Sequence, residues 1–205
     1  MSVARDGLLI DFGGVLTSNV FESFAAFCRA EGLDADAVRD RFREDPAARE
    51  LLGELEEGRI PNADFEARFA PMLGVADHEG LIARLFAGMQ HDDAMFDAVA
   101  AARRAGVRTG LVSNSWGEEG YDRTRFGELF DVLVISGEIG IRKPAPAIYA
   151  LAAERLGRAP ERCVFVDDLP GNLKPAAAIG MATVLHRDAE RTIAELEDHL
   201  GLSLH

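Results

Sequence analysis

Residues 8–17 form the stretch that most constrains the fold of this chain. An apolar run at residues 8–10 ends in a lone carboxylate, Asp11, and Gly13 and Gly14 follow within three residues. An apolar run bounded by glycines predicts a buried central strand that leads into a tight turn. In open α/β sheets, ligands bind at the carboxyl ends of the strands. We therefore expect Asp11 either to act on a ligand, as a nucleophile or metal ligand, or to cap the turn.

The remaining chain divides into a helical part and an alternating part. Helical periodicity dominates residues 18–90, and strands alternate with helices afterwards. We expect helices at residues 35–43, 46–56, 61–72, 78–88, 93–104, 121–129, 147–156, 172–179 and 189–200, and strands at residues 107–113, 132–136, 163–167 and 183–185. Such alternation predicts a parallel, doubly wound α/β sheet. The expected organisation is an α/β core at residues 1–17 and 92–205, with an all-helical cap, residues 18–91, inserted after the first strand.

The charge and the cysteines limit the classes of partner and compartment. The 205 residues hold 22 basic and 35 acidic side chains, which gives a net charge of −13. An acidic surface argues against nucleic acid or an anionic membrane as the main partner, because both require a basic footprint. Cys28 and Cys163 lie far apart in apolar settings, so we expect two buried thiols. With no signal peptide or membrane span in the pattern, we expect a cytoplasmic protein of undetermined oligomeric state.

Polar side chains follow each of the predicted strands. Ser113 and Asn114 come after the second strand, Lys143 stands before a proline after the third, and Asp167 and Asp168 end the fourth. Each feature alone fits ordinary turn chemistry or a solvated lysine. Together they place a nucleophilic acid, a hydroxyl, an ammonium and an acid pair at one sheet edge. Two adjacent acids there favour a hard divalent cation. The joint pattern predicts a phosphoryl-transfer site.

Four stretches carry a resemblance to a known family. In order, they are residues 11–16, 113–116, 142–149 and 164–175. On these stretches the chain resembles the haloacid dehalogenase-like (HAD-like) hydrolase superfamily, and the likeness covers nearly the whole chain. Within it, the sequence is most similar to the amino-terminal phosphatase domain of soluble epoxide hydrolase and to the bacterial glucose-1-phosphate phosphatases. The resemblance implies a Rossmann-like core of the HAD type, with a mobile cap that shields the site and selects substrates.

The resemblance also implies roles for the charged residues of the site. Asp11 matches the nucleophile that forms an aspartyl-phosphate intermediate. Lys143 matches the cation that offsets the charge of the nucleophile and of the phosphate. Asp168 matches the acid that binds Mg²⁺, and Asp167 contributes directly or through water. The backbone carbonyl of Gly13 is implied as a further magnesium ligand.

The remaining predicted site residues surround these charges. Ser113 matches the hydroxyl that binds the phosphoryl group, with Asn114 beside it in the phosphate-binding segment. Asn172 is implied to orient the ligands from behind. Trp116 lies close to the site, and its roles in contacting a leaving group and in packing are both open.

One departure from the family pattern concerns Gly13. Most phosphatases of the superfamily carry a second aspartate there, which protonates the leaving group and later activates water. Such general acid–base help contributes about 10²–10⁴ in rate. The glucose-1-phosphate phosphatase branch likewise has glycine, so activity with a leaving group of low basicity, such as an anomeric or acyl phosphate, stays open. An acid near the cap, with His91, Asp92 and Asp93 as candidates, is the other way to replace it.

These observations predict a Mg²⁺-dependent phosphatase acting on a small phosphorylated metabolite. Sugar phosphates are the first expectation; lipid phosphates are the analogy from epoxide hydrolase, but the sequence shows no obvious long apolar tunnel. Two alternatives remain. A metal-independent 2-haloacid dehalogenase also lacks the second acid, although Asp167 and Asp168 argue against it. The other alternative is a weakly active or inactive module that binds a phosphorylated ligand.

Overall fold

The computed structural model describes residues 5–117, 121 and 123–204. Its central layer is one sheet of five strands: β1 (Gly7–Ile10), β2 (Arg108–Ser113), β3 (Val132–Ile135), β4 (Cys163–Asp167) and β5 (Ala182–Leu185). All neighbouring strands are parallel, in the order β3-β2-β1-β4-β5. This arrangement confirms the predicted doubly wound sheet. It also places β1 at the centre, so that Asp11 emerges between the ends of β2 and β4.

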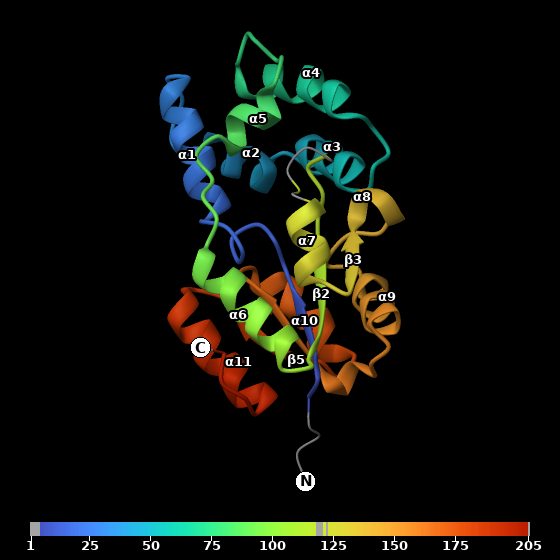
Figure 1. The fold of residues 1–205 in the computed structure, drawn as a ribbon. Helices are drawn as coiled ribbons and strands as arrows, with labels where there is room; N and C mark the ends of the chain where they lie inside the picture. The colour runs from blue at the N-terminus through green and yellow to red at the C-terminus, as the bar shows by residue number, and fades with distance from the viewer. Residues whose placement is uncertain (1–4, 118–120, 122, 205) are drawn as a thin grey trace.

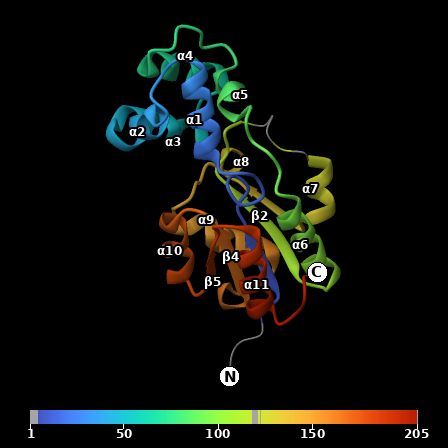
Figure 2. The same ribbon diagram turned by 90° about the vertical axis from the view of Figure 1, so that its left-hand side faces the viewer.

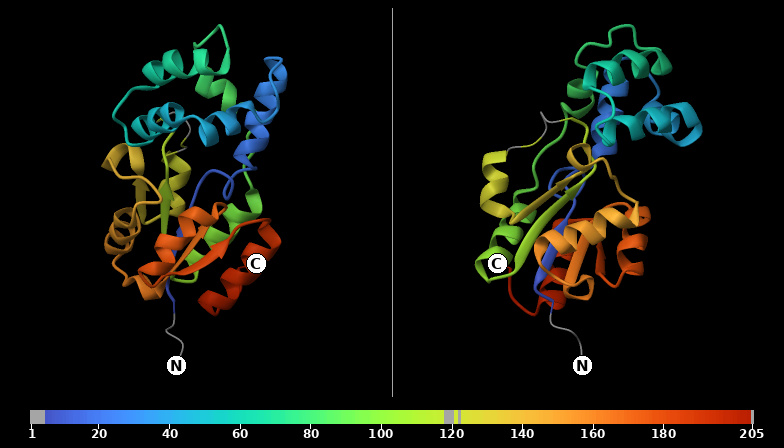
Figure 3. Two further views of the ribbon diagram at one scale, coloured as in Figure 1. Left: turned by 180° about the vertical axis from the view of Figure 1, so that it is seen from behind. Right: turned by 90° about the vertical axis from the view of Figure 1, so that its right-hand side faces the viewer.

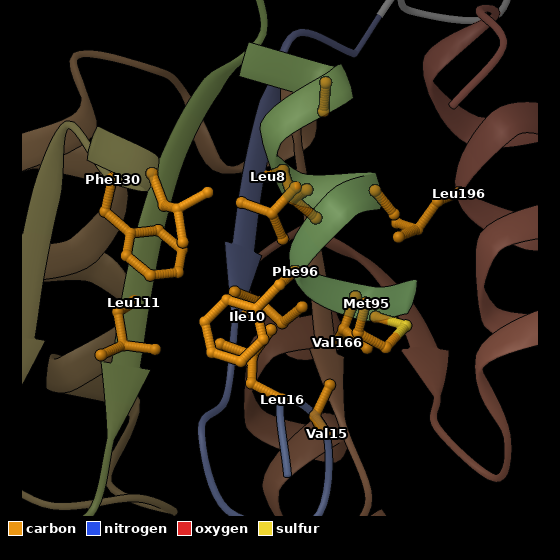
Figure 4. Close-up of a cluster of buried hydrophobic side chains, with 14 of the residues drawn as sticks. Leu8, Ile10, Val15, Leu16, Met95, Phe96, Leu111, Phe130, Val166 and Leu196 are labelled. Carbon is orange, nitrogen blue, oxygen red and sulfur yellow. The ribbon is translucent and has the colours of Figure 1, made fainter. Parts of the chain in front are cut away.

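Helices cover both faces of the sheet (Figure 2). One face packs against α6 (Asp93–Arg104), α7 (Arg123–Leu129) and α11 (Ala189–Leu200), and the other against α9 (Pro146–Leu156) and α10 (Pro170–Ala178). Because side chains of a strand alternate between the two faces of the sheet, Leu8 and Ile10 pack on the face covered by α6, α7 and α11. Leu9 packs on the face covered by α9 and α10. Figure 4 shows Leu8 and Ile10 packed beside Phe96 of α6. Burial on both faces explains why the β1 sequence reads as a continuous apolar run.

Five helices form a separate layer at one end of the molecule, beyond the carboxyl ends of the strands (Figures 1 and 3). We call them the cap helices: α1 (Val20–Ala30), α2 (Ala37–Glu44), α3 (Pro46–Glu56), α4 (Asn62–Leu73) and α5 (Leu81–Phe86). They share an apolar cluster of their own, which includes Phe24, Phe27 and Cys28. The helical insertion after β1 is therefore present as expected. The domain boundaries at residues 17/18 and 91/92 stay a prediction.

The chain enters and leaves the cap helices through two adjacent segments. Thr17 and His91 form an antiparallel bridge. The backbone N–H of Ser18 donates to the carbonyl of Gln90 (2.7 Å), and that of Asp92 donates to the carbonyl of Leu16 (3.0 Å). These two hydrogen bonds flank the Thr17–His91 pair and hold the entering and leaving segments side by side.

Several of the expected elements begin or end at other residues in the structure. The strand expected through residue 136 ends at Ile135, because Ser136 begins the short helix α8 (Ser136–Ile139). Helix α10 starts at Pro170, two residues before the expected start, since proline suits the first helical turn. Helix α5 covers only Leu81–Phe86 of residues 78–88, because Gly80 adopts a left-handed φ of 64°. A short 3₁₀ turn, η1 (Pro160–Arg162), precedes β4.

Two expectations from composition can be compared with the structure. Cys28 and Cys163 are both free and buried, as expected. No helix within the described part of the chain is long and apolar enough to cross a membrane.

The packing predicts a large energetic difference between two leucines. Leu9 is fully buried in β1, whereas Leu169 is 40% exposed. We expect Leu9→Ala to lower the free energy of unfolding by about 2–5 kcal/mol and Leu169→Ala to change it by less than about 0.5 kcal/mol. Urea unfolding of both variants measures this difference. Equal losses would contradict the placement of Leu9 in the central strand.

Candidate active site

The predicted site residues gather at the carboxyl edge of the sheet, facing the cap helices. A cavity of about 800 Å³ lies between the sheet and the cap helices. The predicted site residues on its wall are Asp11, Gly13, Ser113, Asn114, Trp116, Lys143, Asp168 and Asn172. Asp167 lies behind the wall and is fully buried. Segments separated by more than a hundred residues are therefore brought together by the parallel strand order.

Lys143 is the centre of the charged cluster. Its Nζ lies 2.7 Å from Asp11 Oδ1 and 2.7 Å from Asp167 Oδ2. Burial alone disfavours the ammonium, but the two carboxylates raise the pKa of Lys143 above its ordinary value. For Asp11, burial raises the pKa to about 8, against the opposing effect of Lys143. The cluster therefore holds more negative charge than one lysine neutralises.

Asp167 fixes this lysine from the interior. Its Oδ1 accepts the backbone N–H of Leu169 (2.9 Å), and both carboxylate oxygens accept from Asn172 Nδ2 (3.0 and 3.1 Å). Lys143 then completes the bonds to Oδ2. These contacts make Asp167 a support for Lys143, and Asn172 in turn holds the Asp167 carboxylate.

Asp168 lies close to Gly14, in the loop that follows Asp11. A Cβ atom at Gly14 would lie 2.6 Å from Asp168 Oδ2, and Gly14 has a φ of 76°. Glycine is therefore needed there both for the backbone conformation and for the approach of the carboxylate. Burial, followed by repulsion from Asp167, raises the pKa of Asp168 to about 6.

The carboxylate cluster fits a divalent cation. One oxygen each from Asp11, Asp167 and Asp168 can be chosen so that all lie within 4.8 Å of one another. Hard cations prefer such oxygen ligands. Because Asp167 is already occupied by Lys143 and Asn172, Asp11 and Asp168 have the carboxylate oxygens best placed for a metal.

The loop after β2 is hydrogen-bonded to the backbone of Lys143. Asn114 accepts from the Lys143 N–H (2.8 Å) and donates to the Lys143 carbonyl (3.0 Å). Ser113 Oγ lies 2.9 Å from the hydroxyl of Tyr121, which also lines the cavity. Burial raises the pKa of Tyr121 to about 12, so the phenol keeps its proton near neutral pH.

Glu56, at the end of α3, connects the cap helices to this segment. Its Oε2 accepts from Arg142 (2.8 Å) and from Asn114 (3.3 Å), and its carbonyl accepts from the Ser136 hydroxyl. Burial raises the pKa of Glu56. One cap residue thereby contacts the loops that follow β2 and β3.

Trp116 belongs to an aromatic group on the cap side of the cavity. Its ring centroid lies 5.5 Å from that of Phe24, 5.9 Å from Phe42, 5.6 Å from Phe65 and 5.2 Å from Phe86. The side chain both packs in this group and lines the cavity. The structure is thus consistent with both roles that the sequence left open for Trp116.

The acids expected near the cap junction lie away from the cavity wall. Asp92 caps α6 by accepting from the Met95 N–H, while His91 and Asp93 contact Arg125. None of the three lines the cavity. At position 13, a Cβ atom would lie 3.1 Å from Val20 Cγ2, a tight contact that requires the Val20 side chain to shift by a few tenths of an ångström.

Sequence reasoning missed Glu56 and Tyr121. Glu56 lies 58 residues before Asn114 in an ordinary amphipathic helix, so no local pattern marks it. Tyr121 was placed at the start of a helix, but the structure begins α7 at Arg123 and turns the Tyr121 ring against Phe12 at 5.4 Å. Only the tertiary contacts identify these two residues.

Comparisons with known proteins agree with this architecture. A family model described as haloacid dehalogenase-like hydrolase matches residues 6–180. Rat bifunctional epoxide hydrolase 2 is 36% identical over 114 residues, which are 52% of this chain and 21% of that protein. Glyceraldehyde 3-phosphate phosphatase of Methanopyrus kandleri is 42% identical over 79 residues, or 38% of this chain and 33% of the other. The chain therefore spans a third or less of these curated relatives.

A solved structure shows the same fold. A HAD family enzyme of Bacteroides thetaiotaomicron, in complex with magnesium and inorganic phosphate, superposes with a TM-score of 0.67. The superposition covers 90% of this chain and 95% of the other, at 23% identity. The likeness extends through both the sheet and the cap helices.

The contacts of Glu56 predict a specific loss of stability. Glu56→Ala removes the carboxylate that accepts from Arg142 at 2.8 Å and from Asn114 at 3.3 Å, so we expect the free energy of unfolding to fall by about 1–3 kcal/mol. The neighbouring Glu57, whose Oε1 is 3.6 Å from Arg142 Nε and which is more exposed, provides the matched control. Glu57→Ala should cost less than about 1 kcal/mol. Chemical denaturation measures both, and an equal cost would contradict the proposed connection.

Proposed function

The chain belongs to the haloacid dehalogenase-like hydrolase family, and from this premise we propose that it is a Mg²⁺-dependent phosphatase. The observation that carries this proposal is the pairing of buried Asp11 with Lys143 at 2.7 Å, with the Asp168 carboxylate close to Gly14. The phosphatase name of the Methanopyrus relative supports the same reaction class. The proposed substrate is a small phosphorylated molecule.

Asp11 is the proposed nucleophile. Its Oδ1 is held by Lys143 and by the Phe12 N–H (2.7 Å), which fixes the orientation of the carboxylate toward the cavity. Attack on phosphorus forms an aspartyl-phosphate and breaks the bond to the leaving oxygen. Water then attacks this phosphorus, which releases inorganic phosphate and restores the Asp11 carboxylate.

Lys143 and Ser113 stabilise the transferred group in this proposal. The Lys143 ammonium places positive charge beside both the nucleophile and the incoming phosphoryl oxygens, in a buried site where such charge acts strongly. Ser113 offers a hydroxyl, and Asn114 sets the position of Lys143 through the backbone. The Asp167 carboxylate keeps the ammonium in place from behind.

Asp11, Asp168 and the carbonyl of Gly13 are the residues that would hold Mg²⁺. The metal would supply charge stabilisation for the phosphoryl oxygens. The raised pKa of Asp11 and of Asp168 follows chiefly from burial, with repulsion between neighbouring carboxylates adding to it. This excess of buried negative charge supports binding of a divalent cation.

Asp11→Asn should abolish turnover of phosphate monoesters. An amide is a poor nucleophile, so we expect kcat/KM to fall by at least about 10³-fold. The control is Asp97→Asn, which makes the same change at an exposed position of α6. Phosphate release in the presence of Mg²⁺ is the measurement. Turnover that survives Asp11→Asn would exclude the nucleophile assignment.

Magnesium binding should be visible as thermal stabilisation. A ligand that binds only the folded state raises the melting temperature. We expect Mg²⁺ to raise the Tm of the wild type and of Asp97→Asn, and to have little effect on Asp168→Asn. Differential scanning calorimetry at matched ionic strength, with Na⁺ in place of Mg²⁺, provides the comparison. An undiminished rise in Asp168→Asn would contradict the proposed metal site.

A further inference from the structure

The cap side of the cavity presents flat apolar surfaces. Phe21, Phe24, Phe86 and Trp116 all line it. The rings of Phe24 and Phe86 lie 5.5 and 5.2 Å from Trp116, tilted or edge-on. Aromatic side chains in such arrangements favour a flat ring as their partner, through burial and edge-to-face contact. The part of a substrate that extends away from Asp11 therefore meets aromatic walls.

The charged side chains that line the cavity disfavour a second anionic group on the substrate. Lys143 is the only cationic side chain among the described residues that line the cavity, and both Asp11 and Asp167 bind it. Glu56 and Glu66 line the cavity as well. A second phosphate or a carboxylate on the substrate would meet negative charge with no cation to offset it.

The two acidic side chains on the cap side are already engaged. Glu56 accepts from Arg142 and Asn114. Glu66 accepts from the backbone N–H of Ile82 (2.9 Å) and of Gly80 (3.2 Å). A sugar carries several hydroxyls that must each find a partner when they leave water. Beyond the two acids, the described cap helices contribute one further polar side chain to this lining, Asn62, which weighs against a sugar phosphate.

Position 13 adds an independent constraint on the leaving group. Gly13 has no side chain, and Val20 Cγ2 lies 3.1 Å from the place where one would start. No acid from this position can protonate the departing oxygen. A phenol, with a pKa of about 10, leaves as its anion far more readily than an alkyl alcohol does.

We propose that the substrate is an aryl phosphate monoester, in which the phosphate is joined to an uncharged, flat, phenol-type group. This inference rests on the proposed phosphatase function and specifies its substrate class. The aromatic walls of the cavity, Lys143 as the single cation among its described lining residues, and the glycine at position 13 all select the same leaving group. The phosphate lies at Asp11 and Lys143, and the ring extends toward Trp116.

The reaction balances without a further reactant. Asp11 forms a bond to phosphorus while the bond between phosphorus and the phenolic oxygen breaks, and the electron pair leaves with the phenolate. Water then attacks phosphorus and breaks the bond to the Asp11 oxygen. The proton that this water loses ends on the phenolate, so one ester and one water give one phenol and one hydrogen phosphate.

Turnover of a small panel tests the inference. With Mg²⁺, we expect kcat/KM for 1-naphthyl phosphate to exceed that for phenyl phosphate by about tenfold, because the second ring buries more apolar area at similar leaving-group basicity. Both should exceed glucose 6-phosphate by at least about 100-fold. A naphthyl-to-phenyl ratio near one, or glucose 6-phosphate as the better substrate, would overturn the assignment.

Ligand binding to the Asp11→Asn variant tests the substrate class separately from the phosphatase reaction. By calorimetry, 1-naphthyl phosphate should bind at least about tenfold more tightly than inorganic phosphate or glucose 6-phosphate. Equal affinities would overturn the substrate class. If this selectivity appears but the wild type turns over no ester, the phosphatase function fails and the ligand class stands. If esters are hydrolysed with a preference for sugars, only the substrate class fails.

A lysine introduced into the cavity lining, compared with one introduced outside it, tests where the substrate ring lies. Ala83 lines the cavity and is exposed, whereas Ala87 is exposed and lies outside the lining. Ala83→Lys should raise kcat/KM for 4-carboxyphenyl phosphate, relative to 4-acetylphenyl phosphate, by about threefold. Ala87→Lys adds the same charge and should leave the ratio unchanged. The same ratio change in both variants would contradict the placement of the ring against this wall.

Discussion

A buried ammonium shared by two carboxylates is the interaction on which the rest of this structure depends. Lys143 is almost completely buried, and an unpaired charge there would be strongly unfavourable. Asp11 and Asp167 supply the pairing at 2.7 Å each. Asp11 directly follows β1, and Asp167 is the last residue of β4. Because these two strands are parallel neighbours, the register of the sheet fixes the separation of the two acids. The fold and the chemistry are therefore set by the same strand pairing.

The supports of this ion cluster reach outward to the cap helices. Asn172 and Asn114 hold Asp167 and the Lys143 backbone, respectively, and Asn114 in turn contacts Glu56 of α3. A cap residue is thereby two hydrogen-bonding steps from the lysine. Hydrogen bonds thus join the cap helices to the loop after β2 and, through it, to the backbone of Lys143.

Local patterns sufficed for most of the fold. The continuous apolar run of β1 and the glycines after Asp11 report burial and a turn directly, and the alternation of strands and helices reports a parallel sheet. The sequence also placed Asp11, Lys143 and Asp168 at one edge, because parallel strand ends must meet there. It also assigned Asp167 a direct or water-mediated part in metal binding, which stays a prediction; in the structure its oxygens contact Lys143, Asn172 and the Leu169 N–H.

What the sequence could not provide are contacts between distant segments. Glu56 and Tyr121 carry no local pattern, and the aromatic walls of the cavity are assembled from α1, α5 and the loop after β2. The charge and hydrogen bonding of the cavity lining are likewise properties of the assembled structure and are not contained in any one motif.

The most direct test of this account is to find the transferred phosphoryl group on the protein. The enzyme would be mixed with an aryl phosphate labelled in its phosphate, quenched in acid within one turnover, and digested for peptide mapping. The account predicts acid-stable label on the peptide that contains Asp11, formed and lost at rates that match phosphate release. Release of labelled phosphate with no label on Asp11 at any time would contradict it.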